Sequence, residues 1–232
     1  MVYTDIQHST WHRLYGMLEP RIERYACREY LDGFAGLAMP RERIPDLAHL
    51  NGRITPATGW QVVRTSVRYS DAVDWYHHFA RKEFLITDYI RAEEELEFTP
   101  EPDMFHDIFG HLPFLMIPAY AALEELFAPA FLRADEATRE NIKRLAWYST
   151  EFGMIRENGG LKIFGAGLLS SAGEMDRVMS GVVPIEPFRC ETVIEHAKSV
   201  WEFNRILFVA DDLEAYHDEL QRYFDRLPER VN

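Results

Sequence analysis

Two histidines and one glutamate in this chain have the side-chain types that bind a mononuclear non-haem iron(II) ion. His106 and His111 lie five residues apart among acids, prolines and aromatic residues, and Glu151 follows in a second aromatic stretch, Trp147 to Gly153. Two imidazoles and one carboxylate occupy one face of such an ion and leave positions open for oxygen and water. This set of residue types predicts an oxygenase rather than a plain globular domain.

The spacing of the two histidines constrains the backbone that carries them. Five residues of a regular α-helix turn through about 500°, so the two side chains would point about 140° apart. They can reach one ion only if the helix ends or is distorted between them, and Gly110 and Pro113 mark where we expect a break. The spacing also differs from the i, i+4 pair of the zinc metalloproteases. A lone histidine is more often a hydrogen-bonded core residue, so the prediction depends on the surrounding motifs.

Three longer motifs carry a resemblance to a known family. They read Glu101-Pro102-Asp103-x-Phe105-His106-Asp107-x-Phe109-Gly110-His111-x-Pro113, Trp147-Tyr148-x-x-Glu151-Phe152-Gly153 and Gly165-Ala166-Gly167-Leu168-Leu169-Ser170-Ser171-x-Gly173-Glu174. With weaker matches at 58–60 and 89–91, the chain resembles the catalytic domain of the pterin-dependent aromatic amino acid hydroxylases, and most of all the short bacterial phenylalanine hydroxylases. The resemblance extends from about residue 20 to about residue 210.

The resemblance implies which residues act on the metal and on the amino acid substrate. His106, His111 and Glu151 would bind the iron, and Trp147 would pack against the substrate ring, although Trp147 read alone could equally be a core residue. Arg91 would bind the substrate carboxylate, because a guanidinium can offer it two parallel hydrogen bonds. The rest of the amino acid pocket would be formed by Thr99, Asp103, Phe152, Gly167, Ser170 and Ser171. Asp103 would hold Arg91, while Ser170 and Glu174 would orient groups that touch the ligand or the iron.

The pterin-binding positions match the family less well. By the resemblance, Asp107 would face the pterin through water, and Trp75 would stack on it in place of the usual phenylalanine. Ala146 stands where the family usually has a tyrosine on the pterin side of the iron, and Leu85 replaces the usual proline or histidine. The segment 64–70 also lacks the Val-x-Gly-Leu run that contacts the pterin through its backbone. These departures leave the pose of the pterin open.

The resemblance implies a monooxygenase that uses Fe(II), a tetrahydropterin (tetrahydrobiopterin or a bacterial analogue) and O2. Its leading substrate would be free L-phenylalanine, hydroxylated on the ring to tyrosine. The departures at Ala146 and Leu85 motivate an alternative, in which the same chemistry acts on tryptophan, at another ring position or on a secondary-metabolite precursor. A non-catalytic binding protein of the same fold is a third hypothesis, disfavoured because a bare scaffold does not need Arg91 or His111.

Length, charge and cysteine count predict the setting in which the protein works. The 232 residues, 47% of them hydrophobic, suffice for one catalytic domain over 1–232, without the regulatory domain or tetramerising helix of longer relatives. The net charge of −13 disfavours nucleic acid and anionic membranes as partners. Two cysteines, no apolar signal region and no long apolar run favour the cytoplasm. We expect a monomer or weak dimer whose partner is a small aromatic amino acid.

Hydrophobic periodicity and turn residues predict a mainly α-helical fold with small β-strands. That agrees with the single-domain catalytic fold of the family, although periodicity alone would not have identified it. The first helix is expected to begin after Ser9 and to tolerate a split at Pro20. Helices are predicted at 11–31, 71–82, 118–134 and 136–152 and after Asp211 or Asp212, with strands at 60–69, 84–87, 161–164 and 206–209.

Overall fold

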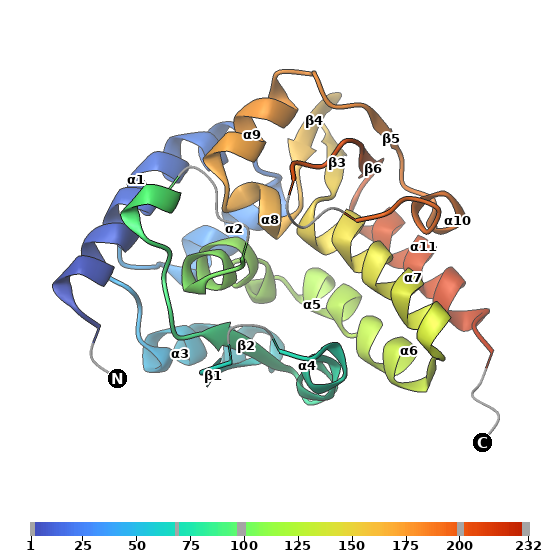
Figure 1. Ribbon diagram of the computed structural model, residues 1–232, viewed down its shortest axis with the longest axis horizontal. Coiled ribbons are helices and arrows are strands. Elements are labelled where there is room, and N and C mark those ends of the chain that lie inside the picture. The colour runs from blue at the N-terminus through green and yellow to red at the C-terminus, as the bar shows by residue number, and fades with distance from the viewer. Residues whose placement is uncertain (1–2, 68–69, 97–100, 199–201, 229–232) are drawn as a thin grey trace.

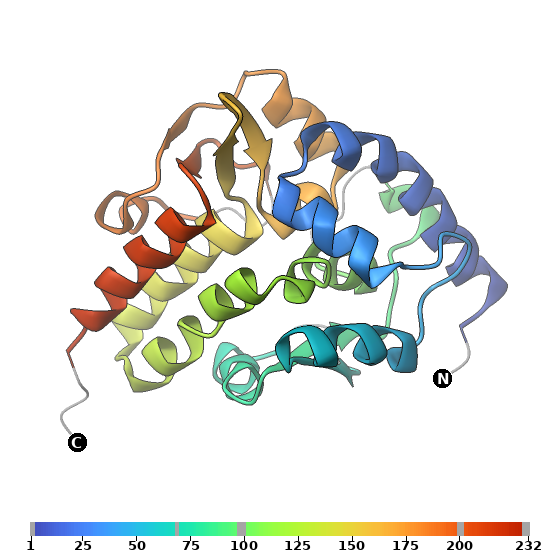
Figure 2. The same ribbon diagram turned by 180° about the vertical axis from the view of Figure 1, so that it is seen from behind.

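The computed structural model describes residues 3–67, 70–96, 101–198 and 202–228. Helices dominate the described chain and the strands are short, so the predicted fold class is confirmed (Figures 1 and 2). The α-helices are α1 (Asp5–Tyr25), α2 (Arg28–Leu37), α3 (Leu47–Thr58), α4 (Ala72–Phe79), α5 (Pro118–Glu124), α6 (Phe127–Arg133), α7 (Glu136–Ala146), α8 (Ala166–Leu169), α9 (Ala172–Met179), α10 (Cys190–Val193) and α11 (Leu213–Asp225).

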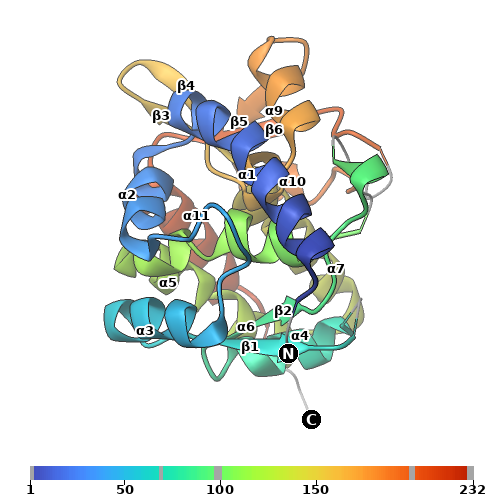
Figure 3. The same ribbon diagram turned by 90° about the vertical axis from the view of Figure 1, so that its left-hand side faces the viewer.

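Two small sheets lie on opposite sides of the central helices. In the first, β1 (Gln61–Thr65) pairs in parallel with β2 (Glu83–Thr87). The second has the strand order β4-β3-β6-β5, built from β3 (Met154–Glu157), β4 (Gly160–Ile163), β5 (Ile185–Pro187) and β6 (Leu207–Ala210). Viewed from the side, the first sheet lies at the bottom and the second at the top, with α5 between them (Figure 3). The helices between the sheets carry several residues of the site.

The start of the chain corrects the predicted first helix. Helix α1 begins after Thr4, not after Ser9, because Thr4 and Gln7 form a reciprocal capping box. Pro20 lies inside α1 without ending it, and the buried stripe of Leu14, Leu18 and Ile22 continues past it. Tertiary burial therefore outweighs the one hydrogen bond that the proline removes.

Other boundaries also differ from the predicted ones. The helix expected at 118–134 is two helices, α5 and α6, and the one expected at 136–152 leaves the α form after Ala146. Strands β3 and β5 and helix α10 were not predicted, because short segments carry too little periodicity to be recognised. Asp71 and Asp212 cap α4 and α11 as predicted.

The core is rich in aromatic side chains that surround the segment of the two histidines. Phe105 and Phe109 stack at 4.7 Å between ring centroids, and Trp11 and Tyr15 pack against them edge-on. Among the described residues, no single helix is long and apolar enough to cross a membrane. One pair of consecutive segments, 106–116 and 118–133, is together long and apolar enough, but the two are bent by 116° where they meet.

The close packing of α2 leads to a stability prediction. A Cβ atom on Gly33 would stand 1.8 Å from the backbone oxygen of Pro113, just after His111. We expect Gly33→Ala to lower the free energy of unfolding by about 1–3 kcal/mol or more through overpacking. The control is Gly52→Ala in α3, where nothing lies within 4 Å of an added Cβ; it should stabilise by roughly 0.5–1 kcal/mol. Urea denaturation measures both, and two equal effects would contradict the packing argument.

Candidate active site

The two histidines are carried by a single widened helical turn. The segment η2 (His106–His111) is a π-helix, in which hydrogen bonds join residues five apart and not four. The wider turn brings residues five apart towards one face, so the predicted distortion is confirmed. Its form differs from the expected break at Gly110: the helix continues through that residue, where a Cβ would lie 2.7 Å from the backbone oxygen of Ala166 in α8.

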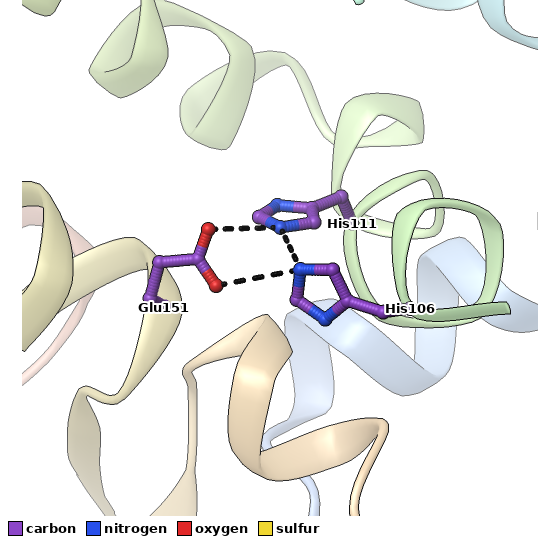
Figure 4. A group of neighbouring side chains, drawn as sticks. All are labelled: His106, His111 and Glu151. Atoms are coloured by element: carbon purple, nitrogen blue, oxygen red, sulfur yellow. Dashed lines mark hydrogen bonds and ion pairs between the residues drawn. The ribbon is translucent and has the colours of Figure 1, made fainter. Parts of the chain in front are cut away.

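A second π-helical turn presents the carboxylate. Helix α7 continues as η4 (Trp147–Glu151), and the N–H of Phe152 donates to the carbonyl of Trp147 at 2.9 Å, five residues back. This turn points Glu151 at the histidines (Figure 4). Its Oε1 lies 3.2 Å from Nε2 of His111, and its Oε2 lies 3.6 Å from Nε2 of His106. Two π turns far apart in the sequence thus face each other across the site.

The three side chains have the geometry and the charge of a metal site. One ligand atom from each of His106, His111 and Glu151 lies within 4.8 Å of the others. Burial lowers the pKa of His106 to about 4, so this imidazole is neutral at neutral pH. Burial alone would raise the pKa of Glu151, but the facing imidazoles, above all His111 through its charge when protonated and its hydrogen bond, outweigh it and lower that pKa to about 2. A neutral imidazole and an ionised carboxylate are the forms that bind a metal ion.

Ser170 fixes which nitrogen of His106 faces the site. Its hydroxyl lies 2.8 Å from Nδ1 of His106 and donates its own hydrogen to the carbonyl of Ala166 at 2.9 Å. Because a hydroxyl has one hydrogen, it accepts from Nδ1–H of His106, which leaves the lone pair of Nε2 towards the metal position. Such support from behind a ligand orients the ring and tunes its basicity.

Arg91 and Asp103 form a buried, doubly bonded pair. The guanidinium donates from Nη2 to Oδ1 at 2.8 Å and from Nε to Oδ2 at 3.0 Å, and the backbone N–H of Arg91 adds a third bond at 2.7 Å. Both side chains are at most 2% exposed. Burial acts to raise the pKa of Asp103, but the Arg91 charge and hydrogen bonds lower it overall, so the carboxylate stays ionised. Asp103 thereby fixes the positively charged guanidinium of Arg91 at the cavity wall.

One cavity of about 740 Å³ connects Arg91 with the metal ligands. Besides these residues, its amino acid side is lined by the predicted residues Trp147, Phe152, Gly167, Ser170 and Ser171. The rings of Trp147 and Phe152 lie 4.4 Å apart, and a Cβ on Gly167 would come within 2.6 Å of the Phe152 ring. Asp103 lies behind Arg91 and does not line the cavity, and Thr99 falls outside the described residues.

The predicted pterin positions line the same cavity. Trp75 is half-buried and packs against Phe79 and Phe84, with centroids 5.1 and 5.4 Å away, which leaves an aromatic surface on the cavity. Asp107 accepts from the backbone N–H and hydroxyl of Thr87, and burial raises its pKa to about 7. Ala146 and Leu85 also line the cavity. An aromatic face with polar groups at its edge suits a flat, polar heterocycle.

The structure places three further polar residues at the cavity that sequence reasoning missed or placed differently. Asn204 accepts from the indole N–H of Trp147 at 2.8 Å, and Glu174 accepts from the backbone N–H of Asn204 at 3.4 Å. Glu174 therefore contacts the partner of Trp147 and not the iron ligands. Glu124 is a buried acid on the cavity wall. No signal in the sequence distinguishes Glu124 or Asn204 from ordinary polar residues.

Comparison with known proteins places this arrangement in a family. Residues 1–232 match the model of the biopterin-dependent aromatic amino acid hydroxylases. The chain is 34% identical to phenylalanine-4-hydroxylase of Ralstonia nicotianae, over 99% of this chain and 74% of that protein. It is 33% identical to that of Caulobacter vibrioides, over 99% of this chain and 78% of that protein.

Solved structures agree with this placement. The Chromobacterium violaceum phenylalanine hydroxylase with bound iron(III) and 7,8-dihydrobiopterin superposes with a TM-score of 0.90 at 29% identity, covering 98% of this chain and 85% of that chain. The Legionella pneumophila phenylalanine hydroxylase gives 0.91 at 28% identity, covering 100% and 96%. The predicted iron and pterin cofactors are confirmed, and the hypothesis of a non-catalytic protein loses its support. The chain belongs to the biopterin-dependent aromatic amino acid hydroxylases, enzymes that combine a His-His-Glu iron site with a pterin.

Proposed function

We propose that this enzyme hydroxylates the ring of free L-phenylalanine to give tyrosine. The observation that carries the proposal is that one cavity joins a buried guanidinium to the His-His-Glu set, with an aromatic wall at the same cavity. A guanidinium suits the carboxylate of a free amino acid, and the aromatic wall suits its ring. The named relatives, which are phenylalanine hydroxylases, support the same substrate.

The residues around the cavity would bind and orient this substrate. Asp103 engages Nε and one N–H of Nη2 of Arg91, so Nη1 and the second N–H of Nη2 remain as a donor pair for the substrate carboxylate. Trp147 and Phe152 would hold the ring close to the metal ligands. Asn204 fixes the indole of Trp147 through a hydrogen bond, and the missing side chain of Gly167 leaves room for the Phe152 ring. Ser171 lines the same cavity, and we assign Thr99 to the amino acid pocket on the resemblance alone. Holding both reactants in one geometry removes much of the entropic barrier.

The cofactors supply chemistry that the side chains cannot. When bound, iron and a reduced pterin together activate O2. His106, His111 and Glu151 would hold the metal, with His106 set in one tautomer by Ser170. Trp75 and Asp107 would hold the pterin by stacking and by hydrogen bonding through water. Burial of the site keeps bulk water from competing with the substrate.

A second candidate function keeps the chemistry and changes the substrate. Ala146 and Leu85 both line the cavity and differ from the family residues. The enlarged or reshaped space favours tryptophan, a different ring position or a secondary-metabolite precursor as the alternative. Anaerobic reconstitution with Fe(II) and tetrahydropterin, followed by O2 and mass spectrometry, would test each aromatic amino acid for a gain of one oxygen atom. Tyrosine regioisomer standards then identify the ring position, and a product from tryptophan alone would overturn the leading proposal.

The setting of the enzyme is also part of this proposal. The buried hydrophobic residues form one connected core, which supports a single catalytic domain over 1–232. Cys27 and Cys190 are free and buried, which fits a reducing cytoplasm. The net charge of −13 disfavours nucleic acid and anionic membrane surfaces. We propose that the enzyme acts as a monomer or weak dimer.

The departure at Ala146 gives a prediction about the pterin. Its small side chain lines the cavity, so Ala146→Tyr, which restores the family residue, would place a ring in that space. We expect a larger change in the KM for the pterin, or in the preference between two tetrahydropterins, than in the KM for the amino acid. If a neighbour such as Trp75 already fills the gap, the tyrosine would overpack the site and cost about 1–3 kcal/mol of stability. Steady-state kinetics with two tetrahydropterins and a thermal melt separate these outcomes. A stable variant with unaltered kinetics for both pterins would refute the idea.

A further inference from the structure

The last residue of α5, Glu124, is a cavity-lining acid with no assigned role. It is 4% exposed and accepts a hydrogen bond from the hydroxyl of Tyr120 at 2.7 Å. Tyr120 is itself buried and stacks on Phe114 at 4.4 Å, so the hydroxyl is held in place. The neighbouring Glu125 pairs with Lys82 at 2.8 Å and does not line the cavity. Two adjacent glutamates therefore have different surroundings.

The surroundings of Glu124 do not compensate a buried carboxylate. A carboxylate offers about four acceptor sites, and in the part of the chain that the structure describes, Tyr120 fills one of them. Among the described residues, the charged groups that act on it are His111 and Glu151, and no lysine or arginine is one of them. Burying such a group costs free energy unless it is hydrogen-bonded or paired. A partner from outside the chain, entering the cavity, would supply what the protein leaves out.

The elements around Glu124 are those of the pterin side. Helix α6 follows α5 and packs on both α4 and α7. Helix α4 carries Trp75 and, next to it, Tyr76, whose pKa is raised by burial and, to a smaller extent, by the charge of Glu124. Helix α7 carries Ala146, whose small side chain leaves space on the same cavity. Ser170 and Ser171, on the amino acid side, come from a different part of the chain, between α8 and α9.

We propose that Glu124 is a pterin-binding residue of this chain, whose carboxylate accepts a hydrogen bond from the pterin in the space beside Ala146. The inference rests on the proposed pterin-dependent function. A pterin offers two kinds of donor, the ring N–H groups and the hydroxyls of its side chain, and a carboxyl oxygen accepts from either, whether the group is ionised or protonated.

The competing role for Glu124 is support of the metal site. Nδ1 of His111 is buried and has no hydrogen-bond partner among the described residues, and the charge of Glu124 acts on this imidazole. If Glu124 served mainly as a charge partner of His111, its removal would weaken iron binding. The two roles therefore predict losses of different ligands, and both can be measured without turnover.

Direct binding measurements test the proposal. Fe(II)-loaded wild type, Glu124→Leu and Glu124→Gln would be titrated anaerobically by calorimetry with 7,8-dihydrobiopterin, which has side-chain hydroxyls, and with 6-methyl-7,8-dihydropterin, which has none. We expect Glu124→Leu to raise the Kd for dihydrobiopterin about 10-fold or more. Glu124→Gln keeps the shape and an acceptor, so it should raise the Kd less. The matched control, Glu125→Gln, should change neither Kd.

The pattern of losses decides the outcome. A loss confined to dihydrobiopterin assigns the bond to a side-chain hydroxyl, and an equal loss for both pterins assigns it to a ring N–H. Unchanged Kd values for both pterins, or a fall in iron content in Glu124→Gln with pterin affinity intact, would overturn the proposal. Wild-type turnover is measured separately. A wild type that binds both pterins but hydroxylates no phenylalanine would refute the proposed substrate and leave the Glu124 result standing.

Discussion

Replacing Glu151 with alanine should remove most of the iron and most of the activity, and His106→Ala or His111→Ala should do the same. The wild type should bind about one Fe(II) per chain, because the three ligand atoms converge within 4.8 Å of one another. Loss of a residue that only orients a metal ligand typically costs about 10–100-fold in metal affinity. Removing a metal ligand itself should lower the affinity for iron by more than this factor. Ser170→Ala, which removes only the support behind His106, should lower it by a factor within this range.

Metal analysis and hydroxylation assays on the same preparations would check this result. His12→Ala is a suitable control, because the side chain of His12 is 44% exposed and lies outside the cavity lining; it should retain both iron and activity. A Glu151→Ala variant with full iron-dependent turnover would show that the ligand assignment is wrong. Circular dichroism separates loss of the metal from loss of the fold.

Arg91→Lys should raise the KM for the amino acid roughly 30- to 150-fold while iron binding stays intact. Losing a two-pronged charged contact in a dry pocket costs about 2–3 kcal/mol. A lysine cannot keep both side-chain bonds that Arg91 makes to Asp103 and also present a second donor pair to the substrate. The variant should therefore lose stability as well, since Asp103 is fully buried.

The effect on KM is measured by steady-state kinetics at saturating pterin, with iron content determined in parallel. Arg28→Lys is the matched control, because that arginine lies on the surface with a 79% exposed side chain. It should leave the KM unchanged. If Arg91→Lys also left the KM unchanged, the substrate carboxylate would have to bind elsewhere in the cavity.

Residue type and spacing in the sequence indicated the set of metal ligands and the mainly helical fold, and the motifs shared with the family implied the Arg91–Asp103 pair. These predictions succeed because the chemistry of a side chain belongs to the residue itself, and helix caps such as Asp71 and Asp212 act within a few residues. The spacing of the histidines even required a distorted helix, because a regular one cannot aim both at one ion.

Tertiary structure alone decided how that distortion is made and which polar residues face the cavity. A π turn formed between the histidines, where an ordinary break was expected, and a second one formed at 147–151, where a regular helix was expected. The first is held in place by close contacts such as that of Gly110 with α8. Pro20 stays within α1 because burial of the helix outweighs its lost hydrogen bond. Glu124 and Glu125 are identical in type and adjacent in sequence, and only the packing of α5 against its neighbours, α3, α6 and α11 among them, places one at the cavity and the other in a surface ion pair. Local patterns cannot encode that difference, because it depends on contacts with residues far away in the chain.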